Sequence, residues 1–229
     1  MHLEWGRPGL REAGRQADVV VVVDVLSFTT AVAVATERGV VVHPMRPGEP
    51  YAPAIARRLG AHLAGKRGAA VSLSPLTLAR LPAGERVVLA SPHGATLALE
   101  AAATGATVVA ASLRNAAAVG AWLQGRPRRV VVIAAGESWR DGPPRTAVED
   151  LLGAGAVLSH LPPSTLSAEA RVAADAFRAS RQELEAILRG CTSGRELAAQ
   201  GFVDDVSCAA ELDASPVVPV LVEGAFRPW

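Results

Sequence analysis

The segment Val19-Val20-Val21-Val22-Val23-Asp24 joins five β-branched residues directly to a carboxylate. An uninterrupted apolar run of this length is typical of a strand with two buried faces, as in a parallel sheet. Its carboxyl end, where Asp24 lies, is where open α/β sheets bind their ligands. The hydroxyl residues Ser27, Thr29 and Thr30 follow shortly afterwards. An acid followed by hydroxyls at this position can bind a hard cation and an oxyanion together, which is the first indication of a metal-assisted enzyme.

Short apolar runs of the same kind recur along the chain and alternate with helix-length segments. The predicted strands are residues 19–24, 40–43, 87–90, 108–111 and 130–134. The predicted helices between them are residues 29–38, 96–104 and 115–124. This alternation predicts βαβ units, with right-handed crossovers that place helices on both faces of the sheet. The expected fold class is therefore α/β, a three-layer α/β/α arrangement with a largely parallel central sheet.

The C-terminal third of the chain is predicted to be mostly helical. Residues 167–189 have the spacing of an amphipathic helix, and Ser167 is a plausible cap for it. Residues 217–222 are predicted to form an edge strand, because Pro219 cannot donate a hydrogen bond to a neighbouring strand. We expect residues 1–229 to form one α/β domain, with the option of a C-terminal subdomain from about residue 160.

Composition limits the class of protein. The formal net charge of the 229 residues is +1, which argues against a dedicated nucleic-acid or membrane-surface binder. No apolar run approaches the ~20 residues that cross a bilayer, and we expect no secretory signal. Cys191 and Cys208 are too few for a disulfide framework, so we expect reduced thiols in a cytoplasmic protein.

Two nucleotide-binding patterns are incomplete in this sequence. The segment from Gly60 to Lys66 has Walker A spacing, but Arg67 follows where Ser or Thr is required. Gly153 and Gly155 lack a third glycine and follow no predicted strand, so they do not make a dinucleotide-binding turn. A nucleotide-dependent enzyme is therefore disfavoured.

Two further loops follow predicted strands and carry groups suited to anions. His93, Gly94 and Thr96 precede a helix, whose N-terminal N–H groups and dipole favour negative charge. Arg114 and Asn115 repeat the arrangement after the next strand, and a guanidinium can bind an oxyanion through two N–H groups. The alternative for each loop is ordinary helix capping.

Arg145, Glu149 and Asp150 lie near the start of the next helical region. Adjacent carboxylates on a helix point about 100° apart, so Glu149 and Asp150 cannot face one point in the same way. One of them can bind a metal while the other fixes a partner within the protein. Their apolar and small neighbours indicate a packed helix, where ionised carboxylates need partners. A solvated acidic pair is the alternative.

These pieces, taken in order, resemble the 2-phosphosulfolactate phosphatase family, the ComB-like magnesium-dependent acid phosphatases. The resemblance covers nearly the whole chain. The segments that carry it are Asp24-Val25-Leu26 with Thr29-Thr30, Ser74-Pro75-Leu76, His93-Gly94-Ala95-Thr96, Ser112 with Asn115, Ala135-Gly136, Glu149-Asp150-Leu151-Leu152-Gly153-Ala154-Gly155, Gly201-Phe202-Val203-Asp204-Asp205-Val206, and Cys208-Ala209 followed by Val217-Val218-Pro219-Val220-Leu221.

The resemblance implies an α/β/α layered fold, dependence on Mg²⁺, and hydrolysis of 2-phospho-3-sulfolactate to 3-sulfolactate on a route to coenzyme M. Three positions depart from the family pattern. Ser27 stands where members usually have arginine, and Pro92-His93-Gly94 replaces a more usual Thr-Asn-Gly. The stretch before Ser74-Pro75 is shortened and lacks a Gly-Phe-Asp element. A related small phosphomonoester is therefore an alternative substrate.

The resulting hypothesis is a magnesium-dependent phosphatase for small anionic phosphomonoesters. Mg²⁺ prefers oxygen ligands, so its candidate ligands are Asp24, Glu149 and Asp150, and the candidate catalytic residues are Asp24, Ser27 and Glu149. The candidates for binding substrate and phosphate are Thr29, Thr30, His93, Gly94, Thr96, Arg114, Asn115 and Arg145. Attack by water and a transient phosphoenzyme both stay open. The alternative function is a non-catalytic binding protein for small anions, and in either case we expect a homodimer.

Overall fold

The computed structural model describes residues 1–124 and 129–229, and across these residues nine strands form one sheet in the order β1-β7-β2-β6-β10-β11-β3-β5-β4. These strands are β1 (His2–Trp5), β2 (Val19–Val23), β3 (Val41–Met45), β4 (His62–Leu63), β5 (Arg86–Ala90), β6 (Thr107–Ala111), β7 (Val130–Ala134), β10 (Pro219–Val222) and β11 (Ala225–Pro228). A separate two-stranded ribbon pairs β8 (Glu137–Ser138) with β9 (Pro144–Arg145).

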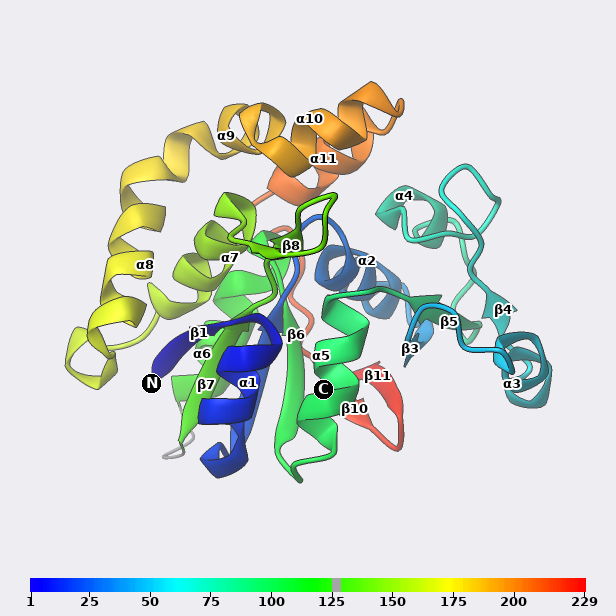
Figure 1. The fold of residues 1–229 in the computed structure, drawn as a ribbon, viewed down its shortest axis with the longest axis horizontal. Helices are drawn as coiled ribbons and strands as arrows, with labels where there is room; N and C mark the ends of the chain where they lie inside the picture. The colour runs from blue at the N-terminus through cyan, green and yellow to red at the C-terminus, as the bar shows by residue number, and fades with distance from the viewer. Residues whose placement is uncertain (125–128) are drawn as a thin grey trace.

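Helices pack on both faces of this sheet and above one end of it (Figure 1). They are α1 (Gly6–Ala13), α2 (Phe28–Glu37), α3 (Ala52–Leu59), α4 (Pro75–Leu78), α5 (Gly94–Ala102), α6 (Ala116–Gln124), α7 (Val148–Leu158), α8 (Ala168–Ser180), α9 (Leu184–Gly190), α10 (Thr192–Ala199) and α11 (Val203–Ala210). Within the described ranges, no helix combines the length and apolar character needed to cross a membrane.

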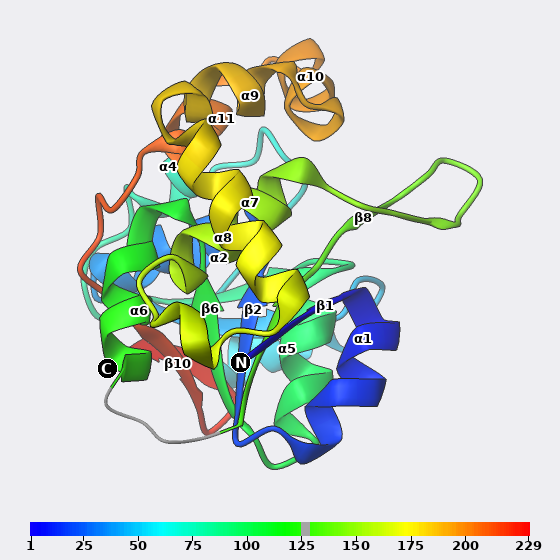
Figure 2. The same ribbon diagram turned by 90° about the vertical axis from the view of Figure 1, so that its left-hand side faces the viewer.

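The five valines of β2 explain why helices cover both faces. Side chains alternate between the two faces of a strand, so its odd and even positions meet different layers. Val19, Val21 and Val23 belong to a hydrophobic cluster with residues of α6, α7 and α8. Val20 and Val22 belong to a second cluster with residues of α1, α2 and α5. Both sets are buried, and the sheet lies between the two helical layers (Figure 1 and Figure 2), which confirms the predicted α/β/α arrangement.

Two parallel groups of strands make up most of the sheet. One group is β1-β7-β2-β6 and the other is β3-β5-β4. The C-terminal hairpin of β10 and β11 lies between them and pairs antiparallel with β6 and β3. The sheet is therefore largely parallel, as predicted, but its two halves are joined by the end of the chain.

The prediction of residues 217–222 as an edge strand was wrong. β10 lies inside the sheet, with β6 on one side and β11 on the other. Pro219 is tolerated because it is the first residue of β10, where a missing N–H removes no bond from the middle of the ladder. Pairing with β6 joins Val220 to Val109. This strand therefore offers no free edge for self-association.

The remaining predicted elements agree with the structure to within about two residues, apart from the C-terminal helix. The predicted helix 167–189 is two helices, α8 and α9, separated by a single 3₁₀ turn at Arg181–Glu183. Ser167 does cap α8, because its side chain accepts a hydrogen bond from the Ala170 backbone N–H at 3.3 Å. β1 was not predicted, although it pairs with β7 over four residues.

Candidate active site

Four carboxylates gather where β2 and β7 end and α7 begins. Asp24 follows β2 directly, Glu137 follows β7, and Glu149 and Asp150 lie in the first turn of α7. Asp24, Glu149 and Asp150 are each at most 6% exposed. Mutual electrostatic effects link the set, because Asp24 and Glu149 both act on Glu137 and on Asp150. The predicted convergence of acids distant in sequence is therefore present.

Backbone and hydroxyl groups hold Asp24 in one orientation. Its Oδ1 accepts a hydrogen bond from the Phe28 N–H at 3.2 Å, and its Oδ2 accepts one from the Gly94 N–H at 2.8 Å. The Ser91 hydroxyl donates to the same Oδ2 at 3.4 Å. The Thr29 hydroxyl donates to the Asp24 carbonyl at 2.8 Å and accepts from the Asp24 N–H at 2.9 Å. The loop after β5 and the start of α2 thus fix the direction of this carboxylate.

The two adjacent acids of α7 have different environments, as their helical geometry predicts. Asp150 accepts hydrogen bonds from the Val25 N–H at 2.7 Å and from the Gly136 N–H at 2.9 Å. It therefore joins the loops that follow β2 and β7. Glu149 Oε2 has no hydrogen-bond partner among the described residues, although it is buried. Asp150 positions the backbone of the site, and Glu149 keeps a carboxylate oxygen available.

Burial and mutual repulsion raise the pKa of several acids in this cluster. Loss of solvation raises the pKa of Asp24 above its ordinary value, against the N–H groups of Phe28 and Gly94. Loss of solvation and then repulsion from Asp24 and Glu149 raise the pKa of Asp150. The same causes raise the pKa of Glu137 to about 8. A site with several buried carboxylates favours binding of protons or cations.

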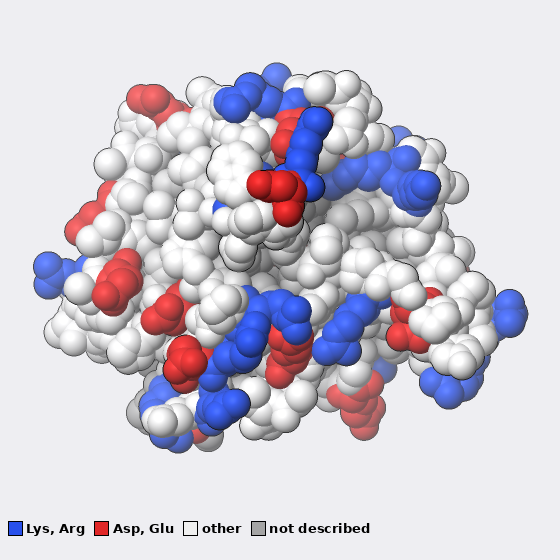
Figure 3. All heavy atoms as spheres, in the orientation of Figure 1, with Lys and Arg blue, Asp and Glu red and all other residues white. Residues whose placement is uncertain are grey.

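A cavity of about 370 Å³ opens beside Glu137. Its charged and titratable lining consists of Arg7, His93, Glu137 and Arg145, and its apolar lining includes Trp5 and Leu97. On this side of the molecule, Lys and Arg side chains lie above and below a central hollow (Figure 3). A pocket whose lining combines cationic groups with apolar surface can hold a small organic anion.

His93 and Arg145 are held at this cavity by other residues. His93 Nδ1 lies 3.4 Å from Glu137 Oε2, and His93 Nε2 lies 3.2 Å from the Ser138 hydroxyl oxygen. Arg145 Nη2 donates to the Ser193 hydroxyl at 3.1 Å, and its guanidinium lies 5.5 Å from the centre of the Trp139 ring. Both residues belong to the cavity lining, which is consistent with their predicted role in substrate binding.

Several residues predicted to bind phosphate instead make internal contacts. Asn115 is fully buried; its carbonyl oxygen accepts from the Ser112 N–H at 2.8 Å, and its amide donates to two backbone carbonyls, of Ala110 and Val217. The alternative of helix capping therefore holds for Asn115. The Thr30 hydroxyl donates to the Val25 carbonyl at 2.7 Å, which holds the turn after β2.

Arg114 and Thr96 are also engaged within the fold. The Arg114 guanidinium donates to the Cys208 carbonyl at 3.1 Å and pairs with Glu211. These contacts hold α11 against the loop after β6, so the structure does not support the prediction that Arg114 binds a second anionic group. The Thr96 hydroxyl donates to the Ser91 carbonyl at 3.3 Å and stabilises the turn that presents Gly94 to Asp24.

Sequence reasoning missed three residues of the site. Glu137 was not among the predicted site residues, although a carboxylate shortly after a buried strand is the same signal that singled out Asp24. Arg67 entered only as the residue that spoils a P-loop pattern, yet it donates to the Ser27 hydroxyl at 2.6 Å. Asp205 pairs with Arg67 across 138 residues of sequence, and no local pattern indicates such a contact.

The donor set partly fits a divalent cation. Among residues 1–124 and 129–229, no three His, Cys, Asp or Glu side chains are grouped closely enough to hold a metal ion. Mg²⁺ is usually bound by one or two carboxylates, with substrate phosphate and waters completing its shell. A buried carboxylate oxygen without a partner is costly, and Glu149 Oε2 is such an atom. These residues fit a cation held by one or two carboxylates together with substrate oxygens.

The fold and the site together define an α/β protein with a buried acidic site at the carboxyl ends of parallel strands. A sequence model described as 2-phosphosulpholactate phosphatase matches residues 7–224. This chain belongs to that family.

Individual relatives agree with this assignment over nearly their full length. A protein of Deinococcus radiodurans is 31% identical over 220 residues, which is 90% of this chain and 89% of the relative. One from Synechococcus sp. (strain CC9605) is 32% identical over 229 residues, and one from Symbiobacterium thermophilum is 30% identical over 230 residues. These matches cover 92% and 95% of both chains, respectively. Each relative is named as a probable 2-phosphosulfolactate phosphatase.

Proposed function

We propose that this protein hydrolyses a small anionic phosphomonoester with the help of Mg²⁺, and that 2-phosphosulfolactate or a related phosphorylated hydroxy acid is the substrate. Membership of the family and the names of the relatives support the substrate. The single structural observation that carries the proposal is the buried cluster of Asp24, Glu149 and Asp150, in which Asp24 and Glu149 act on Glu137, the acid that lines the cavity.

The charge balance of the site supports a divalent cation. A phosphate dianion approaching several buried carboxylates is repelled unless positive charge is present. Bound Mg²⁺ would supply that charge and polarise a phosphoryl oxygen. Asp24 and Glu149 are the residues we assign to hold it, because Asp24 is fixed in direction and Glu149 keeps a free oxygen. Asp150 holds the surrounding backbone through its two N–H partners.

The cavity supplies groups for the organic part of the substrate. Arg145 carries positive charge into its lining, where a sulfonate or carboxylate would be attracted, and Arg7, the second guanidinium of the lining, pairs with Glu100. Trp5 and Leu97 contribute apolar surface that lowers the local dielectric constant and so strengthens that attraction. The size of about 370 Å³ suits a compact ligand.

Glu137 is the group we assign to proton transfer. An alkyl phosphate needs a proton on its leaving oxygen, and a group whose pKa lies near the working pH is best suited to supply it. Burial and repulsion from Asp24 and Glu149 raise the pKa of Glu137 to about 8 when no metal is bound, so this carboxyl can carry a proton near neutral pH. His93 Nδ1 lies 3.4 Å from Glu137 Oε2 and can orient the carboxyl. Positioning and charge neutralisation supply most of the catalysis in phosphoryl transfer.

The experiment is phosphate release from 2-phosphosulfolactate and a panel of phosphomonoesters, with Mg²⁺ and with excess chelator. We expect release only with Mg²⁺. Asp24→Asn is expected to lower kcat by at least about 100-fold, as loss of a group that contacts the reacting centre usually does. Asp18→Asn is the matched control, because Asp18 lies at the other end of β2 and the contacts of its side chain are to Arg129.

Two outcomes contradict the proposal in different ways. Full turnover in excess chelator would overturn the role of Mg²⁺ and leave the phosphatase in place. Binding of sulfolactate-like anions with no phosphate release under any metal would favour the alternative, a non-catalytic anion-binding protein. A cytoplasmic location and a homodimer stay predictions, and light scattering of the purified protein measures the second.

A further inference from the structure

Arg67 is an inward-pointing cation on an otherwise exposed loop. The loop follows β4, and its residues Gly65, Lys66 and Gly68 are exposed. The Arg67 side chain is 16% exposed, and its Nη2 donates to the Ser27 hydroxyl at 2.6 Å. A long side chain loses considerable entropy when it is held in this way, so the contact needs an energetic reason.

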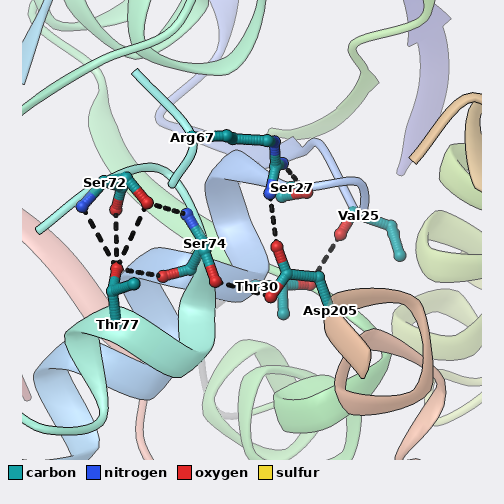
Figure 4. A network of polar contacts seen from close by, with 8 residues as sticks. All are labelled: Val25, Ser27, Thr30, Arg67, Ser72, Ser74, Thr77 and Asp205. Atoms are coloured by element: carbon teal, nitrogen blue, oxygen red, sulfur yellow. Dashed lines mark hydrogen bonds and ion pairs between the residues drawn. The ribbon is translucent and has the colours of Figure 1, made fainter. Parts of the chain in front are cut away.

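Asp205 and Phe202 hold the guanidinium of Arg67 in place. Its Nη1 donates to Asp205 Oδ2, and its carbon lies 5.4 Å from the centre of the Phe202 ring. Asp205 is almost fully buried, and its second oxygen accepts from the Ser74 hydroxyl at 2.5 Å. Figure 4 shows Arg67 above Ser27 and Asp205, while Ser74 contacts the other oxygen of Asp205 from the left. The orientation of the guanidinium is therefore determined by α11 and by the segment leading into α4.

The Nη2 atom of Arg67 lies on the side of the guanidinium that is nearest to the carboxylate site. Ser27 is three residues after Asp24, and the charge of Asp24 acts on Arg67. In the described part of the chain, Asp205 and Ser27 are the hydrogen-bond partners of this guanidinium, which has five N–H groups. The bond to Ser27 is to a neutral hydroxyl, which does not require a cation. Asp205 balances the charge of Arg67, but N–H donors of the guanidinium remain for a further anion.

We propose that Arg67 is the cationic residue of a phosphoryl-binding subsite, in which its guanidinium and the Ser27 hydroxyl donate hydrogen bonds to phosphoryl oxygens beside Asp24. This inference rests on the proposed function and names the residue that meets the transferred group. A planar guanidinium suits two phosphoryl oxygens at once, and an ammonium group does not. Asp205 acts through Arg67 as a positioning residue. The competing explanation is an Arg67–Asp205 pair that only ties the loop to α11.

The experiment compares three single variants and one double variant for KM, kcat, competitive inhibition by inorganic phosphate, and melting temperature. Arg67→Met removes the cation, and Arg67→Lys keeps the positive charge but lacks the planar guanidinium that can donate to two oxygens at once. Lys66→Met is the matched control, because it removes a positive charge from the exposed neighbouring position of the same loop.

Loss of charge-assisted hydrogen bonds to a phosphoryl group is expected to have a large and specific effect. Arg67→Met should raise KM and the phosphate inhibition constant by about 10- to 100-fold. Arg67→Lys should recover part of the loss, and Lys66→Met should match the wild type. The double variant Arg67→Met, Asp205→Asn leaves no unpaired buried carboxylate, so it separates binding from stability. It should melt close to the wild type and still bind phosphate weakly.

Each result has a distinct meaning. Wild-type KM and phosphate inhibition in Arg67→Met, or recovery of both in the double variant, would overturn the subsite and leave the phosphatase in place. If the wild-type protein hydrolyses no phosphomonoester, the proposed function fails. Phosphate binding by calorimetry then tests the subsite independently. Binding lost in the double variant supports it, and equal binding, or none in the wild type, overturns it.

Discussion

Gly94→Ala tests whether the start of α5 is built around the carboxylate of Asp24. A Cβ atom at position 94 would lie 2.6 Å from Asp24 Oδ2, and 2.5 Å and 2.9 Å from Cδ1 and Cβ of Phe28. Distances this short require a neighbour to move. Neither neighbour is free to do so, because Phe28 is fully buried against Phe226 and Asp24 is held by its N–H donors.

The magnitude follows from the cost of overpacking a buried site. That cost is about 1–3 kcal/mol, which lowers the melting temperature of a chain of this length by about 2–12 °C. Displacement of a reacting group by about 1 Å can lower kcat/KM by about 100-fold. Thermal unfolding and phosphate release from the same preparation measure both effects.

Gly190→Ala provides the matched control. Gly190 also lies in a helix, but a Cβ there would meet no atom within 4 Å. Its substitution should leave activity unchanged and stabilise the protein by up to about 1 kcal/mol. A Gly94→Ala protein that melts and turns over like the wild type would refute the tight placement of Asp24 against α5.

Two further predictions concern titration and thiol chemistry. The pKa of Glu137 is about 8 in the folded protein and near 4.5 ordinarily, so the folded state binds more protons between these values. Without metal, the contribution of Glu137 to the free energy of unfolding should be complete below pH 4.5 and fall by up to about 1.4 kcal/mol per pH unit toward pH 8. Denaturant unfolding at a series of pH values measures this slope. A slope that is unchanged in Glu137→Gln contradicts the assignment. Burial and Glu149 raise the pKa of Cys191 to about 12, and burial raises that of Cys208. Both thiols should therefore resist a thiol reagent at pH 8 until the protein is unfolded, and rapid native labelling would show that they are more accessible than the structure indicates.

Local pattern was enough to predict the buried strands β2, β3, β5, β6 and β7 and the helices α2, α5 and α6, because a run of consecutive apolar residues indicates a buried strand. The valines of β2 are an example, since both of their faces are covered. Local pattern was not enough for the short strands β1 and β4. The position of the C-terminal hairpin could not be predicted in this way. β10 and β11 pair with β6 and β3, which lie more than 100 residues earlier in the chain. The local pattern of residues 217–222 fits an edge strand equally well.

The sequence alone determined which side chains could form the site, since Asp24, Glu149 and Asp150 were selected by their positions after a strand and on a packed helix. Only the tertiary structure decided their tasks. Asp150 binds the backbone at Val25 and Gly136, while Glu149 keeps an oxygen free. Asn115 looked equally suited to phosphate, yet its polar atoms are used within the fold. The physical reason is that a polar side chain can form only a few hydrogen bonds, and its partners lie on segments that are brought together only when the chain folds.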